Sequence, residues 1–394
     1  MTVSRIQNRA ESAGTPGSAL RVLLLVDHLR ENGGLRVTID LMERLRAIGI
    51  QADLFVLQRV GGEPTLPLDP QLPVRYATDA RRQLRAALPA GLVRLVALAG
   101  GYDVIVSASE IGYSLLLGRL AARLRRRPYL VLVQAPLVGA IAAWTPRGLQ
   151  ALTRHVHGSV DASICVSHGL VPDILATGLP PERVHVVDVG VDVDRVRELG
   201  RQVADPPRPV ARYLVGVGRL TEQKGFDLLI RAHAKVVDRG HHHRLIIVGE
   251  GADRAALTEL ARRLGVSDTV GFTGFVPNPH WLIAGADLFV LSSRREGSGG
   301  LVLVEALSHG VPVVAADCVS GPRDILADGR FGALVPADDV EALADAIAAH
   351  LADPAPLRER AEHGPARARE YDPARTAQRF AEIAGQLAAR SEDG

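Results

Sequence analysis

Two short segments in the second half of the chain combine cations with glycines at a spacing that suits an anionic ligand. The first, GVGRLTEQKG at 216–225, brings Gly218, Arg219 and Lys224 to the end of an apolar strand. Backbone N–H groups, a helix N-terminus and two cations together bind diphosphate well. The segment is neither a Walker loop nor a dinucleotide fingerprint, because G-K-[ST] and G-x-G-x-x-G are absent. It predicts phosphate binding, with ordinary surface cations as the alternative.

The second segment runs from Glu296 to Glu305 and reads EGSGGLVLVE. Its glycine-rich turn leads into a helix, so free N–H groups of Gly299, Gly300 and Leu301 could hold phosphate or sugar hydroxyls. The Glu305 carboxylate could accept both hydroxyls of a ribose. The alternative is that Glu305 only complements the positive end of its own helix.

The elements that must position these residues are those of a two-domain α/β protein. At 394 residues the chain exceeds the ~250–300 residues at which a single core stops growing. Near-continuous apolar strands alternate with amphipathic helices, a pattern typical of parallel sheets covered on both faces. We expect strands at 21–27, 52–57, 104–107, 129–133 and 162–166, then at 213–217, 245–248, 288–291 and 313–316.

The expected architecture is two doubly wound, Rossmann-like domains that face each other across a cleft, since ligands of such sheets bind at the carboxyl ends of the strands. Residues 1–19 are expected to form a disordered tail. The first domain covers 20–200 and the second 213–372, with a proline-rich linker at 201–212. A helix at 373–394 is expected to pack back on the first domain.

Composition excludes fibrous and wholly disordered classes, with 47% hydrophobic and 23% charged residues. The net charge is only +2, but residues 71–160 hold 12 arginines against three acidic residues. This Arg-rich region could contact an anionic substrate or a membrane surface, or could be solvated helix faces. The two cysteines, Cys165 and Cys318, suit a reducing cytosol.

No targeting or spanning segment is evident. The first 19 residues lack an apolar core, so they are not a secretory signal. The uncharged stretch at 128–144 is shorter than the ~20 residues that a membrane span needs, and we interpret it as a buried strand and a following loop. A soluble, cytoplasmic protein is expected, with peripheral contact at the inner face of the membrane as an option.

Five motifs in order closely resemble those of glycosyltransferase family 4, the retaining GT-B nucleotide-sugar enzymes, and the resemblance covers most of the chain. The motifs are GVGRLTEQKG (216–225), IIVGEG (246–251), FTGFVPN (272–278), SSRREGSGGLVLVEAL (292–307) and GVPVVAADCVSGPRDIL (310–326). The resemblance implies a GT-B fold that binds the acceptor on the first domain and the donor on the second.

The resemblance also implies roles for matching residues. Arg219 and Lys224 would clamp the donor diphosphate, Glu305 would bind the ribose, and Glu296 would lie by the transferred sugar. The remaining donor contacts come from the base-binding turn, the second-domain glycine loop and the first-domain glycine turn: Phe275, Val276, Gly218, Gly299, Gly300, Leu301, Gly33 and Gly34.

Three departures from the family pattern bear on these roles. Glu296 and Glu305 have eight residues between them, whereas the family's paired glutamates usually have seven. Many members carry a histidine after the strand that matches 129–133, and here Gln134 takes that position. A glutamine can bind a sugar hydroxyl but cannot act as a base. The common Asn-Gly-Val-Asp reads VGVD at 189–192.

The expected function is a retaining transfer from a UDP-sugar to a hydroxyl of a small natural-product or aminoglycoside-like sugar, or of a lipid-linked glycan. No cofactor or protein-held metal is expected, although Mg²⁺ could accompany the donor. Two alternatives stay open: a GT-B-fold sugar-nucleotide 2-epimerase and a non-catalytic nucleotide-sugar-binding partner. The sequence at Ser167-His168 resembles a nucleophile–base pair but lacks a nucleophile elbow. The arginine-rich usage suggests an actinobacterial source, and nucleic acid is not expected as a partner.

Overall fold

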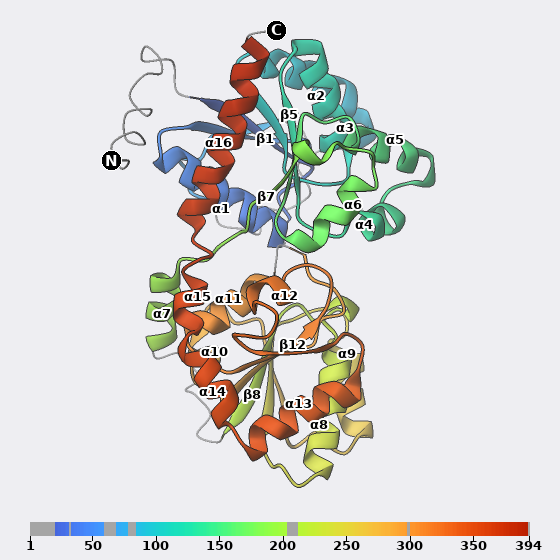
Figure 1. The fold of residues 1–394 in the computed structure, drawn as a ribbon. Helices are drawn as coiled ribbons and strands as arrows, with labels where there is room; N and C mark the ends of the chain where they lie inside the picture. Colours follow the sequence, from blue (N-terminus) through green and yellow to red (C-terminus); the bar gives the residue numbers. More distant parts are fainter. Residues whose placement is uncertain are drawn as a thin grey trace, which may run out of the picture.

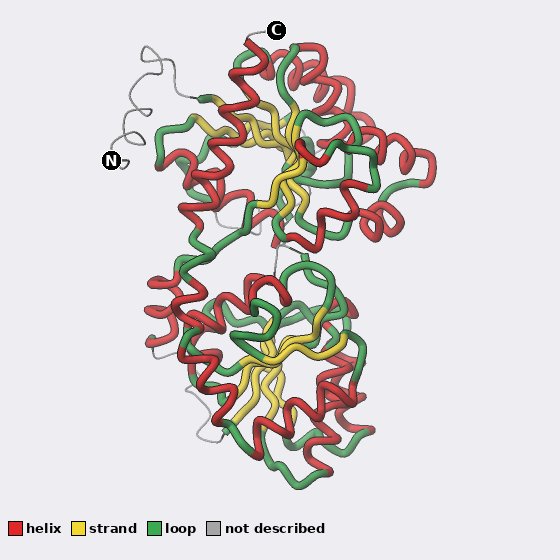
Figure 2. Tube along the Cα trace, in the orientation of Figure 1, coloured by secondary structure: helices red, strands yellow, loops and turns green. Residues whose placement is uncertain are grey.

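The computed structural model describes residues 20–30, 33–58, 68–77, 84–202, 212–297 and 300–392. The expected tail at 1–19, most of the linker and Gly299 lie outside these ranges. The chain forms two lobes, each with one parallel sheet between layers of helices (Figure 1), and Figure 2 shows the two sheets one above the other. This architecture confirms the predicted GT-B class of two Rossmann-like domains.

The first sheet has seven parallel strands in the order β3-β2-β1-β4-β5-β6-β7. Its strands are β1 (Arg21–Val26), β2 (Gln51–Val56), β3 (Val74–Tyr76), β4 (Val104–Ser107), β5 (Tyr129–Val133), β6 (Ala162–Cys165) and β7 (Val184–Val186). The strand order reverses at β1, which lies between β2 and β4. Such a switch point opens a crevice at the carboxyl ends of the strands, where ligands of this fold bind.

Both faces of this sheet are buried, which explains its near-continuous apolar strands. In β1, Val22 and Leu24 face the core under α1 (Gly33–Ala47) and α16 (Pro373–Glu392), while Leu23 and Leu25 face the opposite core. The opposite face is covered by α2 (Leu84–Ala99), α3 (Tyr113–Arg125), α4 (Leu137–Trp144), α5 (Arg147–His157) and α6 (Val171–Leu175).

The second sheet has the order β10-β9-β8-β11-β12-β13, with its switch point at β8. Its strands are β8 (Tyr213–Val217), β9 (Arg244–Val248), β10 (Val270–Gly274), β11 (Leu288–Leu291), β12 (Val313–Asp317) and β13 (Ala333–Pro336). One face carries α8 (Phe226–Asp238), α9 (Arg254–Arg263) and α13 (Val340–Ala352). The other carries α7 (Val193–Arg201), α10 (His280–Ala284), α11 (Leu301–Ser308), α12 (Pro322–Ile325) and α15 (Gly364–Ala368), and α14 (Ala355–Glu362) joins α13 to α15.

The chain crosses between the lobes at two adjoining places. A Cβ on Gly190 would lie 2.0 Å from the carbonyl oxygen of Tyr371. The two connecting segments can therefore lie in contact only because residue 190 is a glycine. Beyond this crossing, α7 packs on α10 and α11 of the second lobe, although the sequence assigned it to the first domain. The reason is that Val193 joins the apolar core of the second lobe. After the return crossing, α16 packs on α1.

The segment after β5 is a helix, so the predicted loop was wrong. Residues Leu137–Trp144 form α4, whose Leu137 and Ile141 are buried while Val138 and Trp144 are exposed. Leucine, alanine and isoleucine are all compatible with a helix. A segment of eight residues is, however, too short to show the helical repeat of apolar residues clearly. Among the described residues, no helix is long and apolar enough to cross a membrane.

Candidate functional site

Glycines bring three loops of the second domain together at the carboxyl end of β8. Gly225 has φ +61°, and a Cβ there would lie 2.1 Å from the carbonyl oxygen of Ser292. A Cβ on Gly249 would lie 1.9 Å from the carbonyl oxygen of Gly218. No other residue fits at these two positions without moving backbone. The loops after β8, β9 and β11 therefore form one surface around Gly218.

Lys224 and Glu296, 72 positions apart, form a salt bridge in this surface. The Lys224 ammonium donates to both carboxylate oxygens of Glu296 at 2.7 Å, and the Ser293 hydroxyl donates to Oε1 at 2.5 Å. The Glu296 side chain is 4% exposed and that of Lys224 is 16% exposed. The pair fixes the cation beside Gly218, where a Cβ would lie 3.3 Å from the Lys224 side chain.

A second set of ion pairs holds the same loops from behind. Arg294 donates to both carboxylate oxygens of Asp227 at 2.7 and 2.8 Å, and its Nε lies 2.7 Å from Asp338. These contacts lower the pKa of Asp227 and raise the pKa of Arg294. Bidentate arginine–carboxylate pairs add geometric precision as well as energy. The loop that carries Lys224 is thus tied to the loop that carries Glu296.

Arg219 follows Gly218 and is exposed. In the part of the chain that the structure describes, no ion pair or hydrogen bond engages its guanidinium. The structure therefore brings together Lys224, held by a carboxylate, and Arg219, whose donors face solvent. Two cations at one glycine-rich loop form the electrostatic half of an anion site.

Glu305 lies in the second turn of α11, which begins after Gly300 with φ +71°. Burial raises the pKa of Glu305 to about 7, and the positive charges of Arg36 and Lys224 offset part of this rise. Some of the residue stays accessible, although protein surrounds the carboxyl group. Arg36 belongs to the first domain, so residues from both domains influence Glu305.

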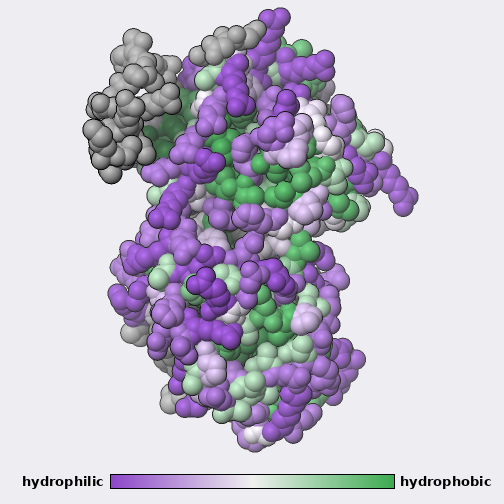
Figure 3. Space-filling model, in the orientation of Figure 1, coloured by the Kyte–Doolittle hydropathy of each residue, from purple (hydrophilic) through white to green (hydrophobic). Residues whose placement is uncertain are grey.

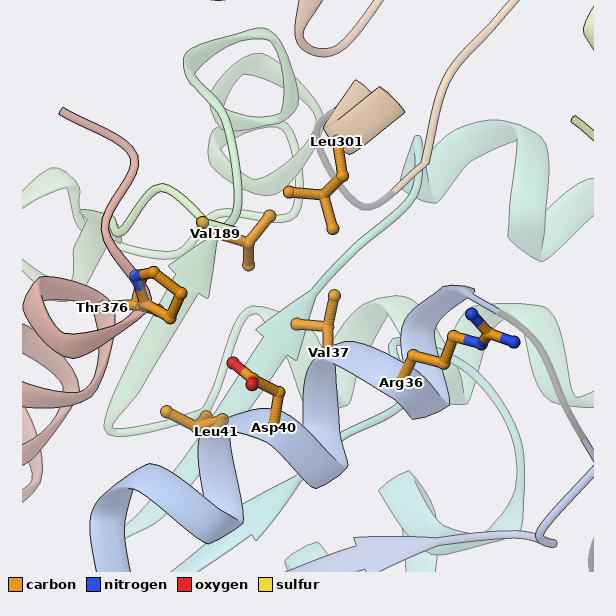
Figure 4. Close-up of a pocket in the computed structure, with 9 residues that line it drawn as sticks. Arg36, Val37, Asp40, Leu41, Val189, Leu301 and Thr376 are labelled. Atoms are coloured by element: carbon orange, nitrogen blue, oxygen red, sulfur yellow. The ribbon is translucent and has the colours of Figure 1, made fainter. Parts of the chain in front are cut away.

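The two domains also meet at a small pocket of about 120 Å³ beside α11 (Figure 4). Leu301 of α11 faces Val37 of α1 and Val189 across this pocket, with Thr376 on the far side. Leu301 also packs on the first domain's core. The helix that carries Glu305 is therefore anchored against both domains.

The remaining donor-site predictions lie after β10 and at the start of α1. Phe275 follows β10 and is 65% exposed, whereas Val276 is half-buried. Gly33 and Gly34 are the first two residues of α1, and the Thr38 hydroxyl donates to the carbonyl oxygen of Gly34 at 2.8 Å. An exposed aromatic ring near a glycine-rich surface suits a stacked or edge-bound base.

Gln134 directly follows β5 on the first domain's side and is 4% exposed. Its Nε2 donates to the carbonyl oxygen of Ala108 at 3.0 Å and to the Thr38 hydroxyl at 3.4 Å. Its Oε1 is buried without a partner among the described residues. A Cβ on Gly297 would lie 3.1 Å from the Gln134 carbonyl oxygen, so the two domains meet here. Gln134 therefore stands directly opposite the Glu296 loop.

Glu110, which follows β4, is a site residue that the sequence analysis missed. Burial raises its pKa to about 7, and the backbone N–H of Gln134 offsets part of this rise. The backbone at Glu110 is fixed, because its carbonyl oxygen accepts a 2.7 Å hydrogen bond from His157 Nε2. A carboxyl group with such a pKa in a cleft is a functional candidate. The feature of the sequence that could have pointed to Glu110 is that no other acidic residue occurs from 104 to 160.

Ser167 and His168 join the domains and do not form a nucleophile–base pair. The Ser167 hydroxyl lies 2.8 Å from the hydroxyl of Ser320, and the His168 backbone N–H donates to Asp324 at 3.2 Å. Both partners belong to the second domain. Within the described ranges, no group of three or more histidine, cysteine or acidic residues could hold a metal ion.

Two family models match this chain in tandem. "Glycosyltransferase Family 4" matches residues 31–195, and "Glycosyl transferases group 1" matches residues 206–367. D-inositol 3-phosphate glycosyltransferase 2 of Catenulispora acidiphila is 31% identical over 89% of each chain. The GDP-mannose-dependent alpha-mannosyltransferase of Mycobacterium tuberculosis is 31% identical over 81% of this chain and 84% of its own.

The fold also matches solved structures. Anabaena Alr3699/HepE in complex with UDP superposes with a TM-score of 0.76 at 23% identity, over 92% of this chain and 99% of that one. Sucrose-phosphate synthase of Thermosynechococcus elongatus gives 0.74 at 22% identity, over 94% and 100%. Together with the tandem family matches and the full-length relatives, the GT-B architecture shows that this chain belongs to glycosyltransferase family 4 and is a nucleotide-sugar glycosyltransferase.

Proposed function

We propose that the protein transfers a sugar from a UDP-sugar to an acceptor hydroxyl with retention of the anomeric configuration. The observation that carries this proposal is the pair of cations at the Gly218 loop: Arg219 open to solvent and Lys224 held by Glu296. A diphosphate placed there would meet guanidinium, ammonium and loop N–H donors together. UDP is bound by the Anabaena neighbour, which supports uracil as the base.

The chemistry we propose needs no nucleophile from the protein. The bond between the sugar C1 and the donor phosphate oxygen breaks, and the acceptor oxygen bonds to C1 on the same face. The leaving diphosphate takes the acceptor proton and is stabilised by Arg219 and Lys224. Such stabilisation of developing charge is usually the largest single term in catalysis. Glu296 would act by fixing Lys224 and by accepting hydrogen bonds from the sugar.

On the donor side, the proposal assigns the ribose to Glu305 and the base to the turn at Phe275 and Val276. The N–H groups at Gly300 and Leu301, with Gly33 and Gly34 from α1, would surround the phosphates. Mg²⁺ would enter together with the donor diphosphate. The two buried, unpaired cysteines, Cys165 and Cys318, favour a cytoplasmic location.

On the acceptor side, Gln134 and Glu110 would bind hydroxyl groups. The unpartnered Oε1 of Gln134 can accept a hydrogen bond, and a Glu110 carboxyl with a pKa near 7 can donate or accept one. We propose a sugar or polyol hydroxyl, either free or carried on a lipid. Relatives named D-inositol 3-phosphate glycosyltransferase support a free acceptor, and one named for lipopolysaccharide core biosynthesis supports a lipid-linked one.

Calorimetric titration with UDP, GDP, TDP and ADP tests the donor assignment. We expect UDP to bind most tightly, with and without Mg²⁺. Losing a charged hydrogen bond costs about 1.5–3 kcal/mol, so Arg219→Ala should weaken UDP binding about 10- to 100-fold. Lys235→Ala, which changes the only other lysine, should not alter it. The name of the mannosyltransferase relative suggests GDP instead. A preference for GDP would show that the proposed base is wrong, but it would agree with the proposed diphosphate site. No binding of any diphosphate would overturn the site.

Product analysis then tests the reaction. With the preferred donor and a panel of sugar, polyol and lipid-linked acceptors, we expect a glycoside with the donor's anomeric configuration, read by the C1 proton coupling. Inverted product would contradict the proposed same-face attack. Conversion of the donor to an epimer without acceptor would show the epimerase alternative instead.

A further inference from the structure

Four consecutive helices of the first domain form a surface with an unusual charge pattern. Helices α2, α3, α4 and α5 contain no aspartate or glutamate. Helices α8, α9 and α14 of the second domain, by contrast, each mix acidic with basic residues. The arginines of α2–α5 are therefore not balanced by acidic residues of their own helices.

The four helices share one face of the first sheet. Their inner sides contribute Leu95, Leu115, Ile141 and Val156 to a single core cluster. Neighbouring helices touch in the order α2 with α3, α3 with α5, and α5 with α4. They form the layer on one side of the upper lobe in Figure 1, opposite α1 and α16. Their outward side chains thus belong to one continuous surface, here called the α2–α5 face.

Large apolar side chains stand exposed on this face. Trp144 is 66% exposed and Val93 is 71% exposed, values that no core role explains. Six of the eleven exposed large hydrophobic residues among those described lie here: Val93, Leu120, Leu124, Val138, Trp144 and Leu152. Apolar side chains concentrated in this way mark an interaction surface. In the view of Figure 3, the rim of both lobes is mostly hydrophilic, and hydrophobic surface is seen toward their middle.

Exposed arginines lie on the same helices, or at their ends, as these apolar residues. Arg123, Arg126, Arg147 and Arg154 are exposed, and none has an ion-pair partner among the described residues. On α9, by comparison, Arg262 is paired with Glu259. A surface that offers tryptophan and leucine together with unneutralised arginine complements the headgroup region of an anionic bilayer.

We propose that the α2–α5 face docks the protein on an anionic lipid membrane. Trp144, at the C-terminal end of α4, would insert at the interface, and Arg147 and Arg154 of α5 would bind lipid phosphates. Gln134 lies in the short link between β5, which ends at Val133, and α4, which begins at Leu137, so docking there would bring the proposed acceptor side close to the lipid surface. This inference goes beyond the proposed function and does not depend on which donor is used.

Vesicle flotation tests the docking. We expect the full chain to float with vesicles of equal phosphatidylglycerol and phosphatidylcholine at 50 mM salt, and not with phosphatidylcholine alone. Binding should fall at least tenfold at 500 mM salt, because the attraction of exposed charges is screened. Flotation on both vesicle types, or on neither, would overturn the proposal.

Tryptophan emission tests the orientation. The chain has two tryptophans, and Trp281 is 3% exposed, so Trp144 should dominate any change. Anionic vesicles should shift the wild-type emission to shorter wavelength, and Trp144→Ala should abolish that shift. A shift that survives in Trp144→Ala would place the membrane contact elsewhere and contradict the proposal.

Charge reversal supplies the matched comparison. Arg147→Glu with Arg154→Glu should weaken vesicle binding at least tenfold and leave UDP affinity unchanged, which also shows that the variant is folded. The same two reversals at Arg263 and Arg358, exposed on α9 and α14, should weaken it clearly less. If both double variants lost vesicle binding equally, net charge alone would explain the attraction, and the α2–α5 face would not be the docking surface. If the protein formed dimers in the absence of vesicles and Trp144→Ala dissociated them, a second copy of the chain would cover the α2–α5 face. That result would refute membrane docking.

Discussion

The two walls of the cleft are built in different ways. The donor wall around Gly218 holds its functional groups in ion pairs: Lys224 with Glu296, and behind them Arg294 with Asp227. The proposed acceptor wall presents Gln134, whose Oε1 has no partner among the described residues, and Glu110, whose pKa burial raises to about 7. A wall of fixed charges suits the diphosphate that we propose as the constant ligand. Groups that can both donate and accept hydrogen bonds would suit the hydroxyl groups of the proposed acceptor.

The largest effect should come from breaking the Lys224–Glu296 pair. Glu296→Gln removes the charge that holds Lys224, and we expect turnover to fall about 100-fold or more, as for loss of a preorganised electrostatic group. The matched control is Glu341→Gln, because Glu341 forms an exposed salt bridge at 2.5 Å with the other lysine, Lys235. Steady-state kinetics should show the control unchanged. Equal losses in both variants would contradict the role of Glu296.

The glycine framework of the donor wall should be the next most sensitive feature. Gly225→Ala adds a Cβ against the Ser292 carbonyl at positive φ, and we expect the free energy of unfolding to fall by about 2–4 kcal/mol. Gly240→Ala also has positive φ, +87°, but meets no atom within 4 Å. It should cost only about 1–2 kcal/mol. Chemical denaturation of both variants measures the difference, and equal costs would contradict the close approach of the two loops.

The strands could be predicted from sequence because their apolar runs reflect burial on both faces. All nine predicted strands are present to within a residue or so, whereas short edge strands such as β3 and β13 escaped notice. Helix α4 was missed because eight residues carry little periodic signal. The sequence placed α7 in the first domain, whereas the structure packs it on the second. Its packing depends on where the chain crosses between the lobes, and no local sequence pattern shows that position.

Candidate residues for a donor site are easier to recognise in the sequence than candidate residues for an acceptor site, for a physical reason. Phosphate binding needs cations and glycines at short spacing, so Arg219 and Lys224 stand out in a loop. The Lys224–Glu296 salt bridge spans 72 positions and could not be seen in either segment alone. Glu110 became notable only through its burial, and burial is a property of the folded chain.

A smaller effect is expected from the pH dependence of stability. The pKa of Glu305 is raised to about 7 in the folded protein, so its stabilising contribution is full below the unfolded pKa near 4.5 and is lost as pH rises through 7. Glu305→Gln should reduce this loss by about 1–3 kcal/mol. Denaturation at pH 5 and pH 8 compares the two proteins. An unchanged difference between the two pH values would contradict the buried state of Glu305.

The smallest effect should appear on the acceptor wall. Glu110→Gln keeps hydrogen-bonding groups but removes titration, and we expect the KM for acceptor to rise about tenfold, about 1.4 kcal/mol, with UDP affinity unchanged. The inflection of kcat/KM near pH 7 should disappear. Glu182→Gln, on the exposed turn at Pro181–Arg183, serves as the control. A change in UDP affinity instead of acceptor KM would move Glu110 to the donor wall.

A crystal structure with UDP would show whether the donor diphosphate lies between Arg219 and Lys224. We expect phosphate oxygens within hydrogen-bonding distance of both side chains, with the ribose at Glu305. Lys224 should keep its contact with Glu296 or exchange it for phosphate. A diphosphate bound away from the 218–225 loop, with Arg219 still facing solvent, would contradict the account.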